Sequence, residues 1–222
     1  QRIAERCCGQ TTFTCDPRLY SFFARSLPHI LLEPVCRLRH LNDMASSPGE
    51  YADLPSSAFV SMFDNHGYAL FKKADKVILD FDAVRSVVKG YEDFSGLARM
   101  KADENLVRQY QAQLPDDGKL NVGLCWRSAL KRYSRARNYC DIEEFAPLLQ
   151  RNDVRFVILQ YDGCTPHESA WLEKEFPGKT ISFEYLDMFR DLDGLAAAIA
   201  ALDLVISPAV NIRQFSGCLG IP

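Results

Sequence analysis

The sequence lacks the short motifs that identify the best-known nucleotide-binding and hydrolytic enzymes. It contains no Gly-x-Gly-x-x-Gly loop, no phosphate-binding loop ending in Gly-Lys-Ser/Thr, no Gly-x-Ser-x-Gly turn and no His-Glu-x-x-His helix. Each of these motifs supplies defined chemistry, namely a backbone cradle for phosphates, an exposed nucleophile or a pair of zinc ligands. Without them, those motif-based mechanisms have no support in this chain.

The chain also lacks a membrane-length apolar run and an excess of positive charge. A membrane helix needs about 20 consecutive apolar residues, whereas the longest candidate, Leu195–Ile206, is shorter and contains Asp203. The start has no basic-then-apolar signal-peptide layout. Lys and Arg number 26 against 29 Asp and Glu, a net charge of -3. We therefore expect no global attraction to nucleic acid or membrane, and any anion site must be local.

The cysteines lack the paired spacing of a metal site or a secreted disulfide framework. The chain has 8 cysteines without a Cys-x-x-Cys pair; Cys7 and Cys8 are adjacent, and no nearby residues complete a metal-ligand set. Cys125 lies in the apolar run Val122–Trp126, where a free thiol behaves as a small hydrophobic group. This distribution predicts a reduced cytoplasmic protein without a metal.

The first part of the chain predicts a β-α-β unit and then a weaker helical region. The predicted elements are strands over 10–15 and 30–32 and helices over 18–27, 57–63, 83–88 and 101–114. Asp16 and Pro17 suit the N-cap and first position of the first helix. The Pro-Asp-Asp-Gly break at 115–118 predicts a boundary between domains 1–116 and 117–222.

The second part predicts a regular alternation of apolar strands and capped helices. Strands are predicted over 120–126, 154–160, 180–183 and 204–206, with helices over 141–149, 165–176 and 192–202. Asp141 with Glu144, and Thr165 with Glu168, have the spacing of capping boxes. Buried strands alternating with helices predict an α/β fold with a parallel sheet. Ligands of such sheets bind beyond the carboxyl ends of the strands.

The segment after the first of these strands is the strongest candidate for an anion site. Residues 127–137 hold five cationic side chains in an otherwise slightly acidic chain. Arg offers a bidentate fork and Lys a point charge for a phosphate or diphosphate. The alternative is a solvated basic loop that docks a partner. The candidate phosphate-binding residues here are Arg127, Ser128, Lys131, Arg132 and Arg137.

Two other strand exits carry further candidates. The exit from 204–206 leads into a helix, whose first N–H groups form a ready anion site, with Ser207, Ala209 and Asn211 as its wall. Gln160 and Asp162 end the second strand and are candidates for contacting a base or ribose, or else form an ordinary capped loop. We find no acid–base pair, because the four histidines lie in different segments. Asp16 is explained equally well as a helix cap, so the catalytic residue is unknown.

Several stretches resemble glycosyltransferases related to bacterial heptosyltransferases, particularly those attached to tetratricopeptide repeats. The matching stretches are Asp16–Leu19, Phe23–Ser26, Met100–Asp103, Val122–Ser128, Phe145–Leu149, Val157–Tyr161, Leu195–Ser207 and Ser216–Pro222. The resemblance runs through most of the second half and thinly through the first. Its most specific part is Ala196–Ser207.

The resemblance implies a GT-B fold of two Rossmann-like halves, with the acceptor in 1–116 and a nucleoside-diphosphate-sugar donor in 117–222. It implies a metal-independent transferase that needs no cofactor besides the donor, and acts on an acceptor that is a protein or a glycan. The family's first strand and glycine loop would precede Gln1 and its closing helices would follow Pro222, so both halves are expected to be incomplete. The chain has Ala209-Val210 and Gln214 where such proteins often carry Asp-Thr and a later His.

Three hypotheses follow. The first is a glycosyltransferase using a nucleoside-diphosphate sugar. The second is a degenerate, non-catalytic GT-B-like module that binds a partner or scaffolds adjacent repeats, as the Ala209, Val210 and Gln214 departures suggest. The third is an unrelated Rossmann-like binder of a phosphorylated small molecule.

Overall fold

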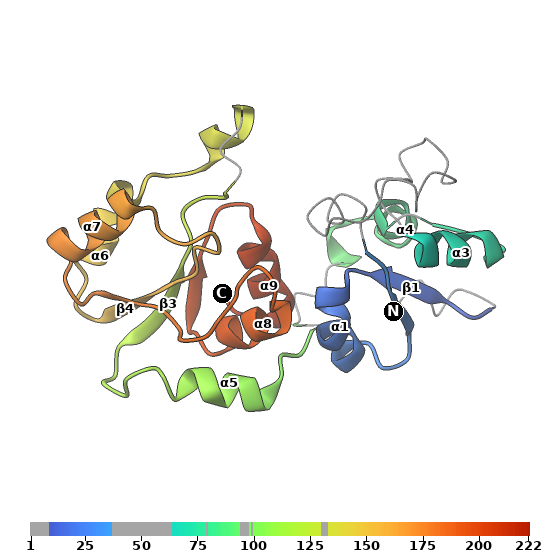
Figure 1. The fold of residues 1–222 in the computed structure, drawn as a ribbon, viewed down its shortest axis with the longest axis horizontal. Coiled ribbons are helices and arrows are strands. Elements are labelled where there is room, and N and C mark those ends of the chain that lie inside the picture. The colour runs from blue at the N-terminus through green and yellow to red at the C-terminus, as the bar shows by residue number, and fades with distance from the viewer. Residues whose placement is uncertain (1–8, 37–63, 79, 94–97, 99, 130–132) are drawn as a thin grey trace. The chain divides into compact units, whose positions relative to one another are not determined.

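The computed structural model describes residues 9–36, 64–78, 80–93, 98, 100–129 and 133–222. These divide into two compact units, Gln1–Gly96 and Leu97–Pro222 (Figure 1). The predicted boundary at 116/117 falls inside the second unit, because helix α5 (Glu104–Gln111) packs against α8 (Leu192–Ala200). In the part of the chain that is described, each helix is too short or too polar to cross a bilayer.

The first unit is built on a β-α-β arrangement, as the sequence predicts. Strands β1 (Thr12–Cys15) and β2 (Leu31–Pro34) pair in parallel. They are joined by the short 3-10 helix η2 (Pro17–Leu19) and by α1 (Tyr20–Ser26), which buries Phe22. Asp16 caps this segment by accepting from the Arg18 N–H. The helix-cap interpretation of Asp16 is therefore confirmed.

Further helices follow in the described part of the first unit. They are α3 (Asn65–Lys73), α4 (Asp80–Val87) and the 3-10 helix η5 (Tyr91–Asp93). The prediction of a helix over 83–88 is confirmed by α4, whereas the helix over 57–63 lies outside the described residues. We did not predict α3, although Asp64 is a good N-cap and accepts from the Gly67 N–H at 2.8 Å.

The second unit contains a parallel four-stranded sheet in the order β5-β4-β3-β6. Its strands are β3 (Leu120–Leu124), β4 (Val154–Ile158), β5 (Thr180–Ile181) and β6 (Leu204–Ile206). Its helical segments, besides α5 and α8, are η6 (Tyr133–Asn138), η7 (Ile142–Phe145), α6 (Ala146–Leu149), α7 (Pro166–Glu175) and α9 (Asn211–Leu219). The four predicted strands are all present, and both predicted capping boxes are confirmed.

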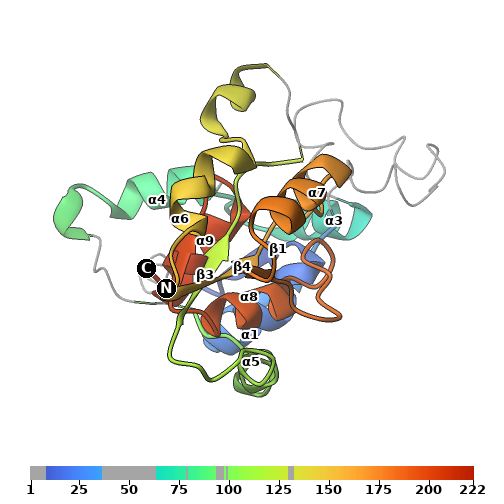
Figure 2. The ribbon, with the colours of Figure 1, turned by 90° about the vertical axis from the view of Figure 1, so that its left-hand side faces the viewer.

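Helices cover both faces of this sheet (Figures 1 and 2). Side chains from alternate positions of β3 and β4, such as Val122 and Phe156, pack with Leu149 of α6 and Leu172 of α7. On the other face lie α8 and α9, with α5 packed on α8. Residues Leu195–Ile199 of α8 are almost completely buried, which explains the uninterrupted apolar character of this helix.

Gly123 lets the side chains of Leu159 and Leu202 pack closely against the central strand β3. A Cβ atom at this position would lie 2.5 Å from Leu159 Cδ1 and 2.8 Å from Leu202 Cδ1, and both leucines are buried. Overpacking of this kind costs about 1–3 kcal/mol. We therefore expect Gly123→Ala to lower the free energy of unfolding by about that amount in urea denaturation.

Gly217→Ala provides a matched control for this prediction. A Cβ atom at Gly217 meets nothing within 4 Å, and alanine is the better helix former by about 1 kcal/mol. The same substitution is therefore expected to stabilise the protein in α9 and destabilise it in β3. An equal effect at both positions would contradict the packing of β3 described above.

Candidate functional site

The carboxyl ends of the second unit's strands meet at one edge of the sheet. Leu124 at the end of β3 is paired with Ile158 of β4 and with Ile206 of β6. The segments after these strands therefore emerge side by side. This is the edge at which open parallel sheets bind ligands, and it brings the 127–129, 160–163 and 207–211 segments together as the sequence predicts.

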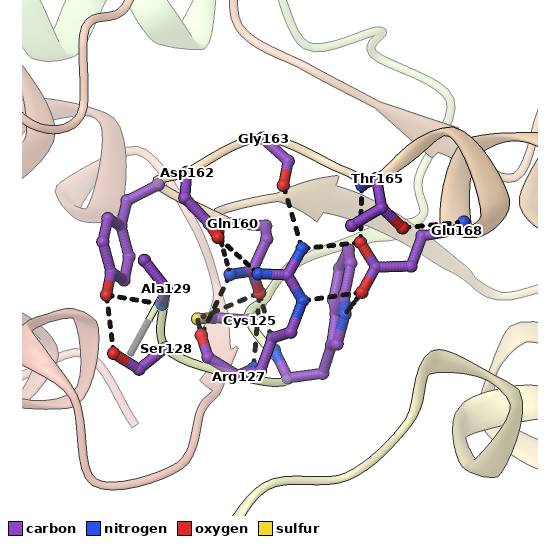
Figure 3. Close-up of polar contacts among 11 residues, drawn as sticks. Cys125, Arg127, Ser128, Ala129, Gln160, Asp162, Gly163, Thr165 and Glu168 are labelled. Atoms are coloured by element: carbon purple, nitrogen blue, oxygen red, sulfur yellow. Dashed lines mark hydrogen bonds and ion pairs between the residues drawn. The ribbon is translucent and has the colours of Figure 1, made fainter. Parts of the chain in front are cut away.

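The guanidinium of Arg127 is buried in a cluster of acidic and carbonyl oxygens (Figure 3). Its Nε and Nη2 atoms each donate to one carboxylate oxygen of Glu168 at 2.6 Å. Nη1 pairs with Asp162, and Nη2 also donates to the Gly163 carbonyl. The Trp126 indole donates to Glu168 at 2.8 Å. Arg127 is only 3% exposed, so in this arrangement it joins the end of β3 to the start of α7.

Gln160 holds the same strand ends together through its amide group. It is 0% exposed. Its Oε1 accepts from the backbone N–H groups of Trp126 and Arg127. Its Nε2 donates to the Arg127 carbonyl and to Asp162. Both amide atoms are thus used within the protein, as in the capped-loop alternative. Contact of Gln160 or Asp162 with a base or ribose stays a prediction.

The electrostatics of this cluster favour the charged forms of Glu168 and Arg127. Burial alone would raise the pKa of Glu168, but hydrogen bonds from Arg127, Trp126 and the Thr165 N–H together lower it well below its usual range. The pKa of Arg127 is raised, chiefly by its hydrogen bonds to Glu168. One cation faces two carboxylates, so the cluster has a net charge of about -1 and would not by itself attract a diphosphate.

The segment that follows Arg127 is tied to Tyr161. The Tyr161 hydroxyl lies 2.7 Å from Ser128 Oγ, and it accepts a hydrogen bond from the Ala129 N–H at 2.9 Å. Figure 3 shows Ser128 and Ala129 at the edge of the cluster, beyond Arg127. Ser128, a predicted phosphate ligand, is 6% exposed and therefore contributes to this local structure.

The exit from β6 leads directly into α9 at the same edge. The Cys125 N–H donates to the Ile206 carbonyl, which places this exit beside the end of β3. Val210 occupies the N-cap position and provides no side-chain cap, while Ala209 and Asn211 are exposed. The first N–H groups of α9 therefore receive no cap from the N-cap side chain, a geometry suited to an anion.

An open hollow of about 490 Å³ lies beyond β4 and β5. It is lined by Gln160, Tyr161, Gly163, Phe183, Tyr185, Leu186, Asp187 and Met188. Tyr185 has a φ of 59° and is 99% exposed. A non-glycine residue in the left-handed region is held there by its surroundings, and such strain gathers at functional sites. The hollow therefore presents aromatic and apolar side chains, together with Gln160 and Asp187, beyond the ends of β4 and β5.

The loop around Tyr185 is anchored on both sides. The Glu184 N–H donates to Gln113 Oε1. Asp187 Oδ1 accepts from the N–H groups of Phe189 and Arg190. These contacts fix the backbone while the Tyr185 ring projects into solvent.

The remaining predicted cations have different outcomes. Arg137 lies in η6 and is exposed, whereas Lys131 and Arg132 lie outside the described residues.

Sequence reasoning missed Glu168, Tyr161 and Tyr185. The capping box with Thr165 already explained Glu168 in the sequence. In the structure the Glu168 carboxylate accepts from both the Thr165 N–H and Arg127. Within the described ranges, no group of three or more potential ligands could hold a metal ion.

Comparison with known proteins bears on the fold. No protein-family model matches the chain. Over 98% of its length the chain superposes on 75% of Escherichia coli ADP-heptose LPS heptosyltransferase II, with a TM-score of 0.53 and 13% identity. The fold is that of a GT-B heptosyltransferase. At this level of identity the likeness concerns the fold alone.

A relative with higher sequence identity is protein FlbA of Caulobacter vibrioides. The two are 34% identical over 126 residues, which make up 56% of this chain and 21% of FlbA. The chain thus spans about a fifth of the length of this curated relative. Attachment to tetratricopeptide repeats stays a prediction from the sequence.

Proposed function

We propose that the protein is a glycosyltransferase that moves a sugar from a nucleoside-diphosphate sugar to an acceptor without the help of a metal. The observation that carries this proposal is the start of α9, which has no side-chain cap from Val210 and follows β6 next to the end of β3, in a GT-B fold. Helix N–H groups and nearby cations can stabilise the charge that develops on a departing diphosphate. The structural neighbour is named for ADP-heptose, which is a nucleoside-diphosphate sugar.

The proposal assigns different tasks to the residues of this edge. The diphosphate lies against the start of α9, with Ser207, Ala209 and Asn211 as the wall. Arg137, together with Lys131 and Arg132, supplies positive charge. Arg127 does not bind the phosphates itself, because its guanidinium is paired with Glu168 and Asp162. It instead holds the end of β3 in place. The nucleobase occupies the hollow, whose aromatic and apolar lining suits a planar ring.

The experiment that tests this function uses the full-length protein and a panel of nucleotides and nucleotide sugars. A ligand at a hundred times its dissociation constant raises the free energy of unfolding by about 2.7 kcal/mol, which a thermal-shift measurement detects. Incubation with the stabilising donors, and with cell extract as the source of acceptor, should then release the nucleoside diphosphate as the sugar passes to the acceptor. Absence of both stabilisation and release across ADP-, UDP-, GDP- and CDP-sugars would contradict the proposal.

A second candidate function is a non-catalytic GT-B-like module that binds a partner. It is favoured by the exposed Ala209 and Gln214 at the start of α9, which offer no ionisable group to a donor. Binding of nucleotide without any release of the diphosphate from its sugar, in the presence of cell extract as acceptor, would support this second function over the first.

Tyr185→Gly is expected to weaken nucleotide binding at the hollow while leaving the stability of the fold nearly unchanged. The ring is 99% exposed, and glycine adopts positive φ without strain but is more flexible when unfolded. We therefore expect the free energy of unfolding to change by less than about 1 kcal/mol. Loss of base stacking should weaken nucleotide binding by about 1–2 kcal/mol, as measured by calorimetry.

Leu120→Gly serves as a comparison for Tyr185→Gly. Leu120 is 50% exposed and begins β3, at the opposite edge of the sheet. Its replacement is expected to leave nucleotide affinity unchanged. Equal affinities for the Tyr185→Gly variant and the wild type would remove the nucleobase from this hollow.

A further inference from the structure

Tyr161 belongs to both candidate parts of the site. Tyr161 lines the hollow beyond β4 and β5. Its hydroxyl is bonded to Ser128 Oγ and to the Ala129 N–H, which follow β3. The Tyr161 side chain therefore joins the hollow to the segment that follows β3, the strand paired with β6.

The buried cluster fixes both partners of this contact. Tyr161 follows Gln160, whose amide makes bonds to the backbone at Trp126 and Arg127. Ser128 follows Arg127, whose guanidinium is held by Glu168. Gln160 and Arg127, which precede the two partners, are therefore held by buried hydrogen bonds. The Tyr161 hydroxyl then binds the chain at Ser128 and Ala129. Ordering this backbone before a ligand arrives lowers the entropic cost of binding.

We propose that Tyr161 is a positioning residue that couples the nucleobase hollow to the diphosphate subsite, so that its hydroxyl selects for ligands carrying phosphates. This inference rests on the proposed function. A nucleoside needs the ring of Tyr161 alone. A nucleoside diphosphate also needs the segment that the hydroxyl holds.

The test is calorimetric titration of full-length wild type and Tyr161→Phe with adenosine and ADP, and with the corresponding uridine and guanosine pairs. Phenylalanine keeps the ring and removes the two hydrogen bonds. With each bond contributing about 1 kcal/mol net, ADP affinity should fall roughly 5- to 30-fold. Adenosine affinity should stay within about twofold of wild type, within the scatter expected for a surface change.

Ser128→Ala provides a second variant that leaves Tyr161 intact. It removes one of the two bonds, so a smaller loss of ADP affinity is expected. The double variant should be no weaker than Tyr161→Phe alone, because groups acting as one unit are not additive. Circular dichroism and urea denaturation confirm that each variant is folded, and Ser128→Ala decides the question if Tyr161→Phe does not fold.

Each result has a defined meaning. A loss confined to the diphosphates supports the inference. Unchanged ADP affinity, or an equal loss for adenosine and ADP, overturns the positioning role while leaving the proposed function standing. If the wild type binds neither nucleosides nor diphosphates, the proposed function fails and this inference fails with it.

Discussion

Replacing Arg127 with alanine is expected to lower the free energy of unfolding by about 3–5 kcal/mol, the cost of breaking a buried ion pair by removing one partner. The substitution leaves the carboxylate of Glu168, which lies in a 7% exposed residue, facing only the Trp126 indole and the Thr165 N–H. Asp162 loses its ionic partner as well. Urea denaturation of the full-length variant measures the loss.

Arg151→Ala is the matched control for this prediction. Arg151 forms an ion pair with Asp153, but the two side chains are 55% and 60% exposed. Such surface pairs contribute about 0–1 kcal/mol. If Arg127→Ala costs no more than Arg151→Ala, the buried cluster does not hold the strand ends together.

The ion pair between Arg127 and Glu168 also predicts how the stability difference between wild type and Arg127→Ala depends on pH. The pKa of Glu168 is lowered in the folded protein, so its contribution is fully present above its unfolded pKa of about 4.3. That contribution is lost as the pH falls through the lower folded pKa. The gap in stability between wild type and Arg127→Ala should therefore be constant from about pH 6 to 8 and shrink below about pH 4. A gap that instead grows on acidification would contradict the ion pairing.

Replacing Asn211 with aspartate is expected to move stability and ligand binding in opposite directions. Asn211 is the first residue of α9 and is exposed. A carboxylate at a helix start interacts favourably with the dipole, by about 0.3–1 kcal/mol. The same charge about 5 Å from a diphosphate should cost about 1.5–3 kcal/mol of binding. ADP affinity should therefore fall about 10- to 150-fold, while the melting temperature rises slightly.

Asn152→Asp controls for the added charge. Asn152 precedes β4 at the other edge of the sheet, and its Oδ1 accepts from Lys179 Nζ. The substitution adds the same charge where no ligand is proposed, so ADP affinity should be unchanged. The loss in Asn211→Asp should shrink at high ionic strength, because salt screens exposed charges. An Asn211→Asp variant with wild-type ADP affinity would place the diphosphate elsewhere.

Local signals allowed much of the second unit to be predicted from the sequence. The capping boxes at Asp141 and Thr165 mark helix starts because both partners lie within one turn. The apolar runs that became β3 and β4 lie in a sheet covered by helices on both faces, and such runs alternating with helices indicate a parallel sheet. Helix α3 was missed because Asp64 follows a region without a clear apolar period.

The role of Arg127 could not be predicted because its partners are distant in the sequence. Glu168 lies 41 residues later and Asp162 35 residues later. Their side chains meet Arg127 only once the sheet has formed and α7 has packed on it. A run of cations after a strand indicates an anion site, but it does not show which of them the protein uses for itself. Tyr185 gave no sequence signal, since its φ of 59° is set by the anchored loop around it.

The position of the diphosphate is tested most directly by a crystal structure of the full-length protein with its tightest-binding nucleoside diphosphate. We expect phosphate oxygens within about 3 Å of the backbone N–H groups at Asn211 and Ile212, and the base in the hollow beside Tyr185. A nucleotide bound in the second unit with its phosphates away from the start of α9 would contradict it.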